Sequence, residues 1–241
     1  PIYCALRAQL HQLDPSLISA APTPKRFKTL PATANGDQWI RIYERRRESV
    51  GLLELTLANS DILMGSAFAI SSTELVTAAH NLKGKVVLAT PPNPTKAIAT
   101  ATAKFHARGS TDIDAAVITL NHGLPSVQVD RRSAIVGESI AIIGFASVPR
   151  RQPTLGIYTG TVESISPDYS GSVSFYQVSV QSSGGLSGSP MFDSQGRVLG
   201  LVVESTYEEG EEGVPRREFF TVLPIRYALE VKDSPTPVQF D

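Results

Sequence analysis

The chain has 241 residues, of which 41% are hydrophobic and 19% are charged, and its formal net charge is −1. This composition is that of an ordinary globular protein, and the near-neutral charge gives no basis for general binding to nucleic acid or to an anionic membrane surface. No apolar run approaches the ~18 residues of a membrane-spanning helix, so the length fits one large all-β domain or two smaller ones.

The single cysteine, Cys4, excludes an internal disulfide. This favours a reducing compartment or a secreted protein of bacterial type. The first residues, PIYCALRAQLHQLDPSL, lack the basic start and long apolar core of a secretory signal. We therefore expect a cytoplasmic or other intracellular location. The alternative is a secreted form from which a signal has been removed, because the sequence begins at Pro1.

Residues 1–47 are predicted to be an N-terminal extension and linker. Residues 19–37 are rich in Ala, Pro and Thr and are typical of an extended linker. The next segment, QWIRIYERRRES, can place its apolar residues on one face of a helix. Its basic run, Arg45–Arg47, favours a solvated helix face over a contact with a phosphate or acidic partner. Any partner or regulatory contact of this extension remains open.

From residue 48 onward, short β-rich runs recur, and most are bounded by Gly, Pro, Asn, Asp or Ser. Strands of this kind, without alternating full-length helices, predict an all-β sandwich or barrel and argue against an α/β fold. FDSQGRV predicts a hairpin in which Gly196 takes a positive φ. IRYALEV predicts a short terminal helix. The runs are VGLLELTL, GSAFAIS, ELVTAA, KVVLAT, AAVITL, SIAIIGF, GTVESI, FYQVSV, RVLGLVV and FFTVL.

A histidine and a carboxylate stand at the edges of two predicted strands. His80 directly follows ELVTAA, where a structural histidine is the alternative to a catalytic one. Asp114 directly precedes AAVITL, and a carboxylate there needs a partner if it is buried. One suitable partner is the Nδ1–H group of an imidazole, whose tautomer the carboxylate would hold. Asp112 is the competing candidate.

A serine lies in the small-residue segment SSGGLSGSPMF, which a flexible surface loop would also explain. The hydroxyl of Ser187 needs a base to become a nucleophile, and an oxyanion needs preorganised N–H donors. Glycines such as Gly185 permit the backbone geometry that aims two amides at one point. The order His80, Asp114, Ser187 is that of the chymotrypsin type of catalytic triad.

Six collinear segments resemble the chymotrypsin-like (trypsin-like) serine peptidases, in particular the HtrA/Deg and V8-like (glutamyl endopeptidase) branch, over about residues 48–230. The resemblance selects Asp114 over Asp112. It implies a peptidase domain over residues 48–241 with two six-stranded antiparallel β-barrels, at about 48–125 and 133–230. The segments are GSAFAISSTELVTAAHNL, DIDAAVITL, VGESIAIIGF, TGTVESI, GGLSGSPMFDSQGRVLGLV and FFTVLPI.

The resemblance also implies an activity. Ser187 would be the nucleophile, His80 its general base and Asp114 the orienting carboxylate, with the amides of Gly185 and Ser187 as the oxyanion hole. The expected function is a serine endopeptidase that acts on a protein or peptide substrate through an acyl-enzyme. It would use no cofactor or metal and bind no nucleic acid or membrane. The alternative is a catalytically silent protease-fold protein used for binding or scaffolding.

The sequence departs from the family pattern beside the serine. Leu186 stands where many members carry Asp or Asn, so activation through an ion pair with a freshly cut N-terminus is not supported. Ser189 replaces the usual second glycine, and Asn81 follows the histidine where disulfide-bonded relatives have cysteine. No PDZ-like module follows the last predicted strand, which favours a lone peptidase domain.

Substrate preference is assigned only by resemblance. Gln181, six residues before Ser187, would lie at the base of the primary pocket, and its neutral side chain does not indicate a preference for Arg or Lys. The acidic segment from Glu204 to Glu212 would edge the cleft, and a solvated acidic hairpin is the favoured alternative.

Overall fold

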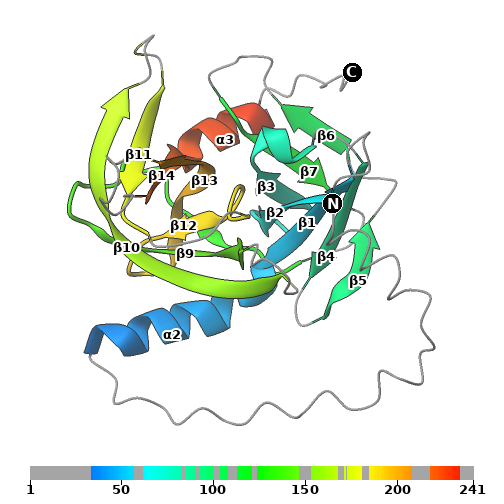
Figure 1. Ribbon diagram of the computed structural model, residues 1–241, viewed down its shortest axis with the longest axis horizontal. Helices are drawn as coiled ribbons and strands as arrows, with labels where there is room; N and C mark the ends of the chain where they lie inside the picture. Colours follow the sequence, from blue (N-terminus) through cyan, green and yellow to red (C-terminus); the bar gives the residue numbers. More distant parts are fainter. Residues whose placement is uncertain are drawn as a thin grey trace, which may run out of the picture.

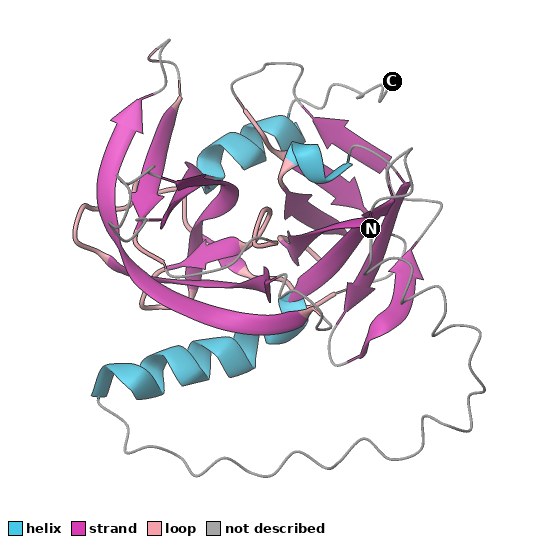
Figure 2. Ribbon diagram, in the orientation of Figure 1, coloured by secondary structure: helices cyan, strands magenta, loops and turns pink. Residues whose placement is uncertain are grey.

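The computed structural model describes residues 34–56, 62–82, 85–90, 93–99, 104–107, 113–120, 124–146, 153–167, 171, 173–180, 185–207 and 218–233. Cys4 and most of the predicted N-terminal extension lie outside these residues. Strands dominate the described chain, as Figure 2 shows.

Seven antiparallel strands form the first sheet, in the order β5-β4-β1-β2-β3-β7-β6. Strand β1, which lies between β4 and β2, is buried on both faces. Val50 and Leu52 enter the core between the sheets, whereas Leu53 and Leu55 enter a smaller core within the first sheet. This division follows from the two-residue period of a strand. The strands are β1 Val50–Thr56, β2 Ile62–Ala69, β3 Glu74–Thr77, β4 Lys85–Thr90, β5 Asn93–Ala99, β6 Lys104–Ala107 and β7 Ala116–Thr119.

The second sheet closes on itself. Its order is β12-β9-β10-β11-β14-β13-β8, and an additional β12–β13 pairing completes a ring of six strands, to which β8 adds in parallel. A closed ring leaves no free edge. The strands are β8 Gln128–Val129, β9 Ser139–Ala146, β10 Thr154–Pro167, β11 Ser174–Val178, β12 Pro190–Phe192, β13 Arg197–Tyr207 and β14 Glu218–Pro224.

The mostly-β architecture with a C-terminal helix confirms the predicted fold class, and every β-rich run quoted above falls on a strand. Four strands have no counterpart among those runs, namely β5, β6, β8 and β12, although the predicted FDSQGRV hairpin implies β12. They are brief, or they contain proline, and so lack an apolar run. With β5 and β6 the first sheet has seven strands where six were predicted. Within the described residues, its end strands β5 and β6 do not pair with each other, so the first sheet is not closed there. Only the second sheet forms a closed ring in the described residues.

One hydrophobic core joins the two sheets and the last helix, α3 (Ile225–Asp233). Phe68 comes from the first sheet and Phe145 from the second, and Ile225 and Leu229 come from α3. The helix contacts β7 of one sheet and β13 and β14 of the other, and Figure 1 shows it between them. The two sheets are therefore held against each other by shared packing.

A second helix, α2 (Ala34–Arg46), is followed by the 3-10 turn η2 (Arg47–Ser49) and lies along the outside of the second barrel (Figure 1). Tyr43 Oη donates to the carbonyl of Leu155 in β10 at 3.2 Å. The helix begins at Ala34, so the linker prediction was wrong for residues 34–37. Of the helices that the structure describes, none has the length and apolar character needed to cross a membrane.

Candidate active site

The pairing of β3 with β7 brings His80 and Asp114 together. Thr77, the last residue of β3, pairs with Ala116, the first residue of β7. His80 follows β3 in the 3-10 turn η3 (Ala79–Leu82), and Asp114 precedes β7, so antiparallel pairing places both residues at the same end of the strand pair.

One carboxylate holds His80 at two points. Asp114 Oδ2 lies 2.5 Å from His80 Nδ1, and Asp114 Oδ1 accepts the main-chain N–H of His80 at 2.9 Å. The two side chains are 37% and 34% exposed, so the pair is accessible to a ligand. With Nδ1–H directed at a carboxylate, Nε2 is left as the ring's proton acceptor.

The main chain of Ser187 is fixed to the first sheet. Its carbonyl accepts from the N–H of Ser66 in β2 at 2.8 Å and from Asn81 Nδ2 at 2.9 Å. The next two residues are fixed to the second barrel, because Gly188 N–H donates to Val202 O at 2.6 Å and Ser189 O accepts from Val202 N–H at 2.9 Å. The loop that carries Ser187 thus spans the junction of the two sheets, beside the turn that carries His80.

This close approach requires glycine at position 188. Gly188 has φ +84°, and a Cβ there would lie 2.0 Å from the carbonyl oxygen of Ser66. On the opposite wall, a Cβ at Gly65 would lie 2.4 Å from Asn81 Nδ2. Because Gly188 and Gly65 have no Cβ, there is room for the Ser187 loop to contact the side chain of Asn81.

A buried hydrogen-bond network surrounds this junction. Thr77 Oγ1 donates to Ser66 O at 2.7 Å and accepts from Asn81 Nδ2 at 3.0 Å. Ser66 Oγ accepts from the N–H of Phe145 in β9 at 3.0 Å. Ser66, which lies in β2 of the first sheet, is therefore hydrogen-bonded both to a strand of the second sheet and to the serine loop. Sequence reasoning did not find the roles of Ser66 and Asn81. The only signal was the absence of cysteine after His80.

In the part of the chain that the structure describes, two main-chain N–H groups of the serine loop have no main-chain acceptor. Gly185 has φ +101°, and neither its N–H nor that of Ser187 donates to a backbone carbonyl within the described residues. Unpaired amides at a partly exposed turn are available to an anion.

Leu186 and Ser189, the two departures from the family pattern, point into the second barrel. Leu186 is 1% exposed and packs in the interior of that barrel. Ser189 is fully buried, and its Oγ occupies the space where a Cβ at Gly144 would lie, 1.8 Å away. Ser189 thus fits in the barrel because Gly144 of β9 has no side chain.

The structure therefore brings His80, Asp114 and the main chain of Ser187 to one place. Asp112 and Gln181 lie outside the described residues. Glu204 lies in β13, but its side chain lies outside the description. No cluster of His, Cys, Asp and Glu suited to a metal ion occurs in the described part of the chain.

Solved structures share this arrangement of sheets. The Rv3671c protease from M. tuberculosis, in its active form, gives a TM-score of 0.66 at 17% identity, covering 92% of this chain and 96% of that one. The HtrA-type protease AlgW with a tripeptide gives 0.65 at 20% identity, covering 81% of this chain and 62% of that one. The serine endoprotease from Yersinia pestis gives 0.63 at 16% identity, covering 86% and 67%.

These likenesses define the class of fold as chymotrypsin-like. Residues 65–201 match the trypsin-like peptidase domain, which is more than half of the chain, and the chain belongs to that family. The predicted resemblance is thereby confirmed, with HtrA-type proteases among the structural neighbours. A comparison with curated proteins finds no match.

Proposed function

We propose that this protein is a serine endopeptidase with Ser187 as nucleophile, His80 as general base and Asp114 as the carboxylate that orients His80. The observation that carries the proposal is the double contact of Asp114 with His80, beside a loop whose Ser187 carbonyl is bonded to Asn81, the residue after His80.

The reaction begins when Ser187 Oγ attacks the carbonyl carbon of a peptide bond and His80 Nε2 takes the hydroxyl proton. The tetrahedral oxyanion accepts hydrogen bonds from the N–H groups of Gly185 and Ser187. The C–N bond then breaks, His80 gives its proton to the leaving amine, and the acyl group stays on Ser187. A water molecule, deprotonated by His80, hydrolyses this ester and frees the enzyme.

Asp114 acts through His80. Its Oδ2 accepts the Nδ1–H, which holds the imidazole tautomer whose Nε2 can take the hydroxyl proton, and it stabilises the imidazolium formed in each step. Its Oδ1 bond to the His80 amide fixes the turn as well as the ring. Both oxygens therefore serve orientation.

The proposed substrate is a peptide or protein. A tripeptide is bound in the structures of AlgW, which share this fold, and this supports a peptide substrate here. Gln181 and Glu204 remain the predicted residues of the primary pocket and its edge, and an intracellular location remains a prediction.

Hydrolysis of a fluorescence-quenched peptide library tests the proposal. Wild-type protein should cleave members of the library, and Ser187→Ala should not. Asp114→Asn should lower turnover by about three to four orders of magnitude, because it holds the wrong imidazole tautomer. Asp112→Asn is the matched control and should retain activity. If the wild type cleaves no member, the catalytically silent binding protein becomes the better account.

A further inference from the structure

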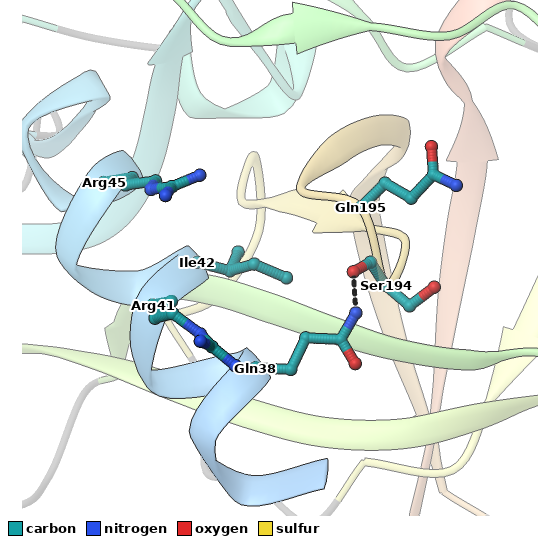
Figure 3. Close-up of a pocket in the computed structure, with 6 residues that line it drawn as sticks. All are labelled: Gln38, Arg41, Ile42, Arg45, Ser194 and Gln195. Atoms are coloured by element: carbon teal, nitrogen blue, oxygen red, sulfur yellow. Dashed lines mark hydrogen bonds between the residues drawn. The ribbon is translucent and has the colours of Figure 1, made fainter. Parts of the chain in front are cut away.

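A hollow lies between α2 and the turn that joins β12 to β13 of the second barrel. It has a volume of about 380 Å³ and is lined by Gln38, Arg41, Ile42, Arg45, Ser194 and Gln195. Figure 3 shows four of these side chains on α2, facing Ser194 and Gln195 in the turn between β12 and β13. A volume of this size is enough for several side chains of a ligand.

The two walls of the hollow are fastened to each other. Gln38 Nε2 donates to the carbonyl of Ser194, and Ile42 is 7% exposed. Gly196, in the β12–β13 turn, has φ +75°, and a Cβ there would lie 3.4 Å from Ile42 Cγ1. The hollow is therefore a shaped site on packed elements.

The charge in the hollow has one sign. Arg41 and Arg45 are one helical turn apart, so their side chains lie on the same face of α2. No lining residue is acidic. Neither arginine takes part in an ion pair within the described residues, whereas Arg47 is paired with Glu44 at 3.5 Å. The nearest carboxylate of the turn, Asp193, is buried and already bonded to Arg197 and Arg132.

We propose that this hollow binds an acidic peptide segment of a partner protein. Two carboxylates of the segment reach Arg41 and Arg45, whose planar guanidinium groups match carboxylates in two-point contacts. The Gln195 amide on the opposite wall offers both a donor and an acceptor to the peptide main chain. Two arginines on a chain of net charge −1 do not make a basic surface that would hold a nucleic acid. The site does not depend on the proposed catalytic activity.

Fluorescence anisotropy tests this inference with the full chain and a fluorescein-labelled Gly-Asp-Glu-Asp-Glu-Gly peptide, a sequence that does not occur in this chain. The peptide should bind at low salt and be released as ionic strength rises, since exposed charges are screened. The double variant Arg41→Gln/Arg45→Gln should bind about tenfold more weakly, as expected for two partly exposed charge contacts. Arg47→Gln removes the same kind of charge next to the site but lines no part of it, and should bind like the wild type.

Fluorescence of the single tryptophan, Trp39 of α2, reports whether the helix stays docked in each variant. An unchanged emission spectrum should accompany the loss of binding. The proposal is overturned if the peptide does not bind, or if the double variant and Arg47→Gln lose affinity equally. It is also overturned if inorganic phosphate competes as well as the peptide does, because the site would then hold a simple anion.

Discussion

Asn81 Nδ2 donates a 2.9 Å hydrogen bond to the main-chain carbonyl of Ser187. The residue after His80 is thus bonded to the residue that carries the proposed nucleophile, across the junction of two sheets. In a reaction that needs Ser187 Oγ and His80 Nε2 in register, Asn81 is a positioning residue, because it touches neither the substrate nor the reacting atoms.

Replacing Asn81 should slow the reaction without weakening substrate binding. Asn81→Ala removes the bonds to Ser187 and to Thr77, and a loosened Ser187 loop should lower kcat about 10- to 100-fold with little change in KM. Steady-state kinetics on one cleaved peptide checks this. Thr77→Val is the control, because it keeps the Asn81–Ser187 bond, and it should have the smaller effect. If the kcat of Asn81→Ala equals that of the wild type, Asn81 is not a positioning residue for this reaction.

Leu186 should stabilise the serine loop through burial in the barrel interior. Leu186→Ala should lower the free energy of unfolding by about 2–5 kcal/mol, the usual range for a buried leucine that leaves a cavity. Urea unfolding measures the difference. Ile165→Ala, at a residue 40% exposed in the same barrel, should change it far less. Equal effects of the two variants would show that Leu186 does not anchor the loop.

Ser189 and Gly144 should behave as a coupled pair. Gly144→Ala places a Cβ 1.8 Å from Ser189 Oγ and should destabilise the fold by about 1–3 kcal/mol or more through overpacking. Ser189→Gly in the same chain removes the clash and should restore most of that loss. A double-mutant cycle from thermal unfolding gives the coupling, and additive effects would contradict the packing described here.

Acid should destabilise the β12–β13 hairpin and the adjoining turn at Glu138. Burial raises the pKa of Asp193, but hydrogen bonds from Arg197, Gln195 and Arg132 outweigh it, so the net pKa is lowered. The hydrogen bond from Arg132 is the main cause of the lowered pKa of Glu138. A carboxyl with a lowered pKa in the folded state stabilises the fold fully above its unfolded pKa. That stability is lost as the pH falls through the folded pKa.

The free energy of unfolding should therefore fall as the pH drops below the usual carboxyl range of about 4. Urea titrations between pH 6 and pH 3 measure this. Asp193→Asn should be less stable than the wild type at pH 6, and the difference between their free energies of unfolding should become smaller toward pH 3. If that difference is the same at every pH, ionised Asp193 does not contribute to the stability of the fold.

Much of this architecture could be predicted from the sequence because its signals are local. Apolar runs between turn residues marked the long strands, and Gly196 marked the hairpin, where φ is +75°. The strand edges of His80 and Asp114 could be read in the same way, and the resemblance chose between Asp114 and Asp112.

The remaining features depend on contacts between distant segments. The bond from Asn81 to Ser187, the fit of Ser189 over Gly144 and the packing of Ile42 on Gly196 each join residues far apart in the chain. None of them leaves a periodic pattern. Short strands such as β12 have too few residues to show alternation, and pairing with their neighbours is what makes them strands.

The central claim is that Ser187 is a nucleophile activated by His80. Its most direct test is reaction with a fluorophosphonate probe under native conditions, followed by intact mass measurement and peptide mapping. The account predicts one phosphonyl group per chain, located on Ser187, with no labelling of Ser187→Ala and much slower labelling of Asp114→Asn. An unlabelled wild type, with candidate activating partners absent or present, or a label on another serine, would contradict it.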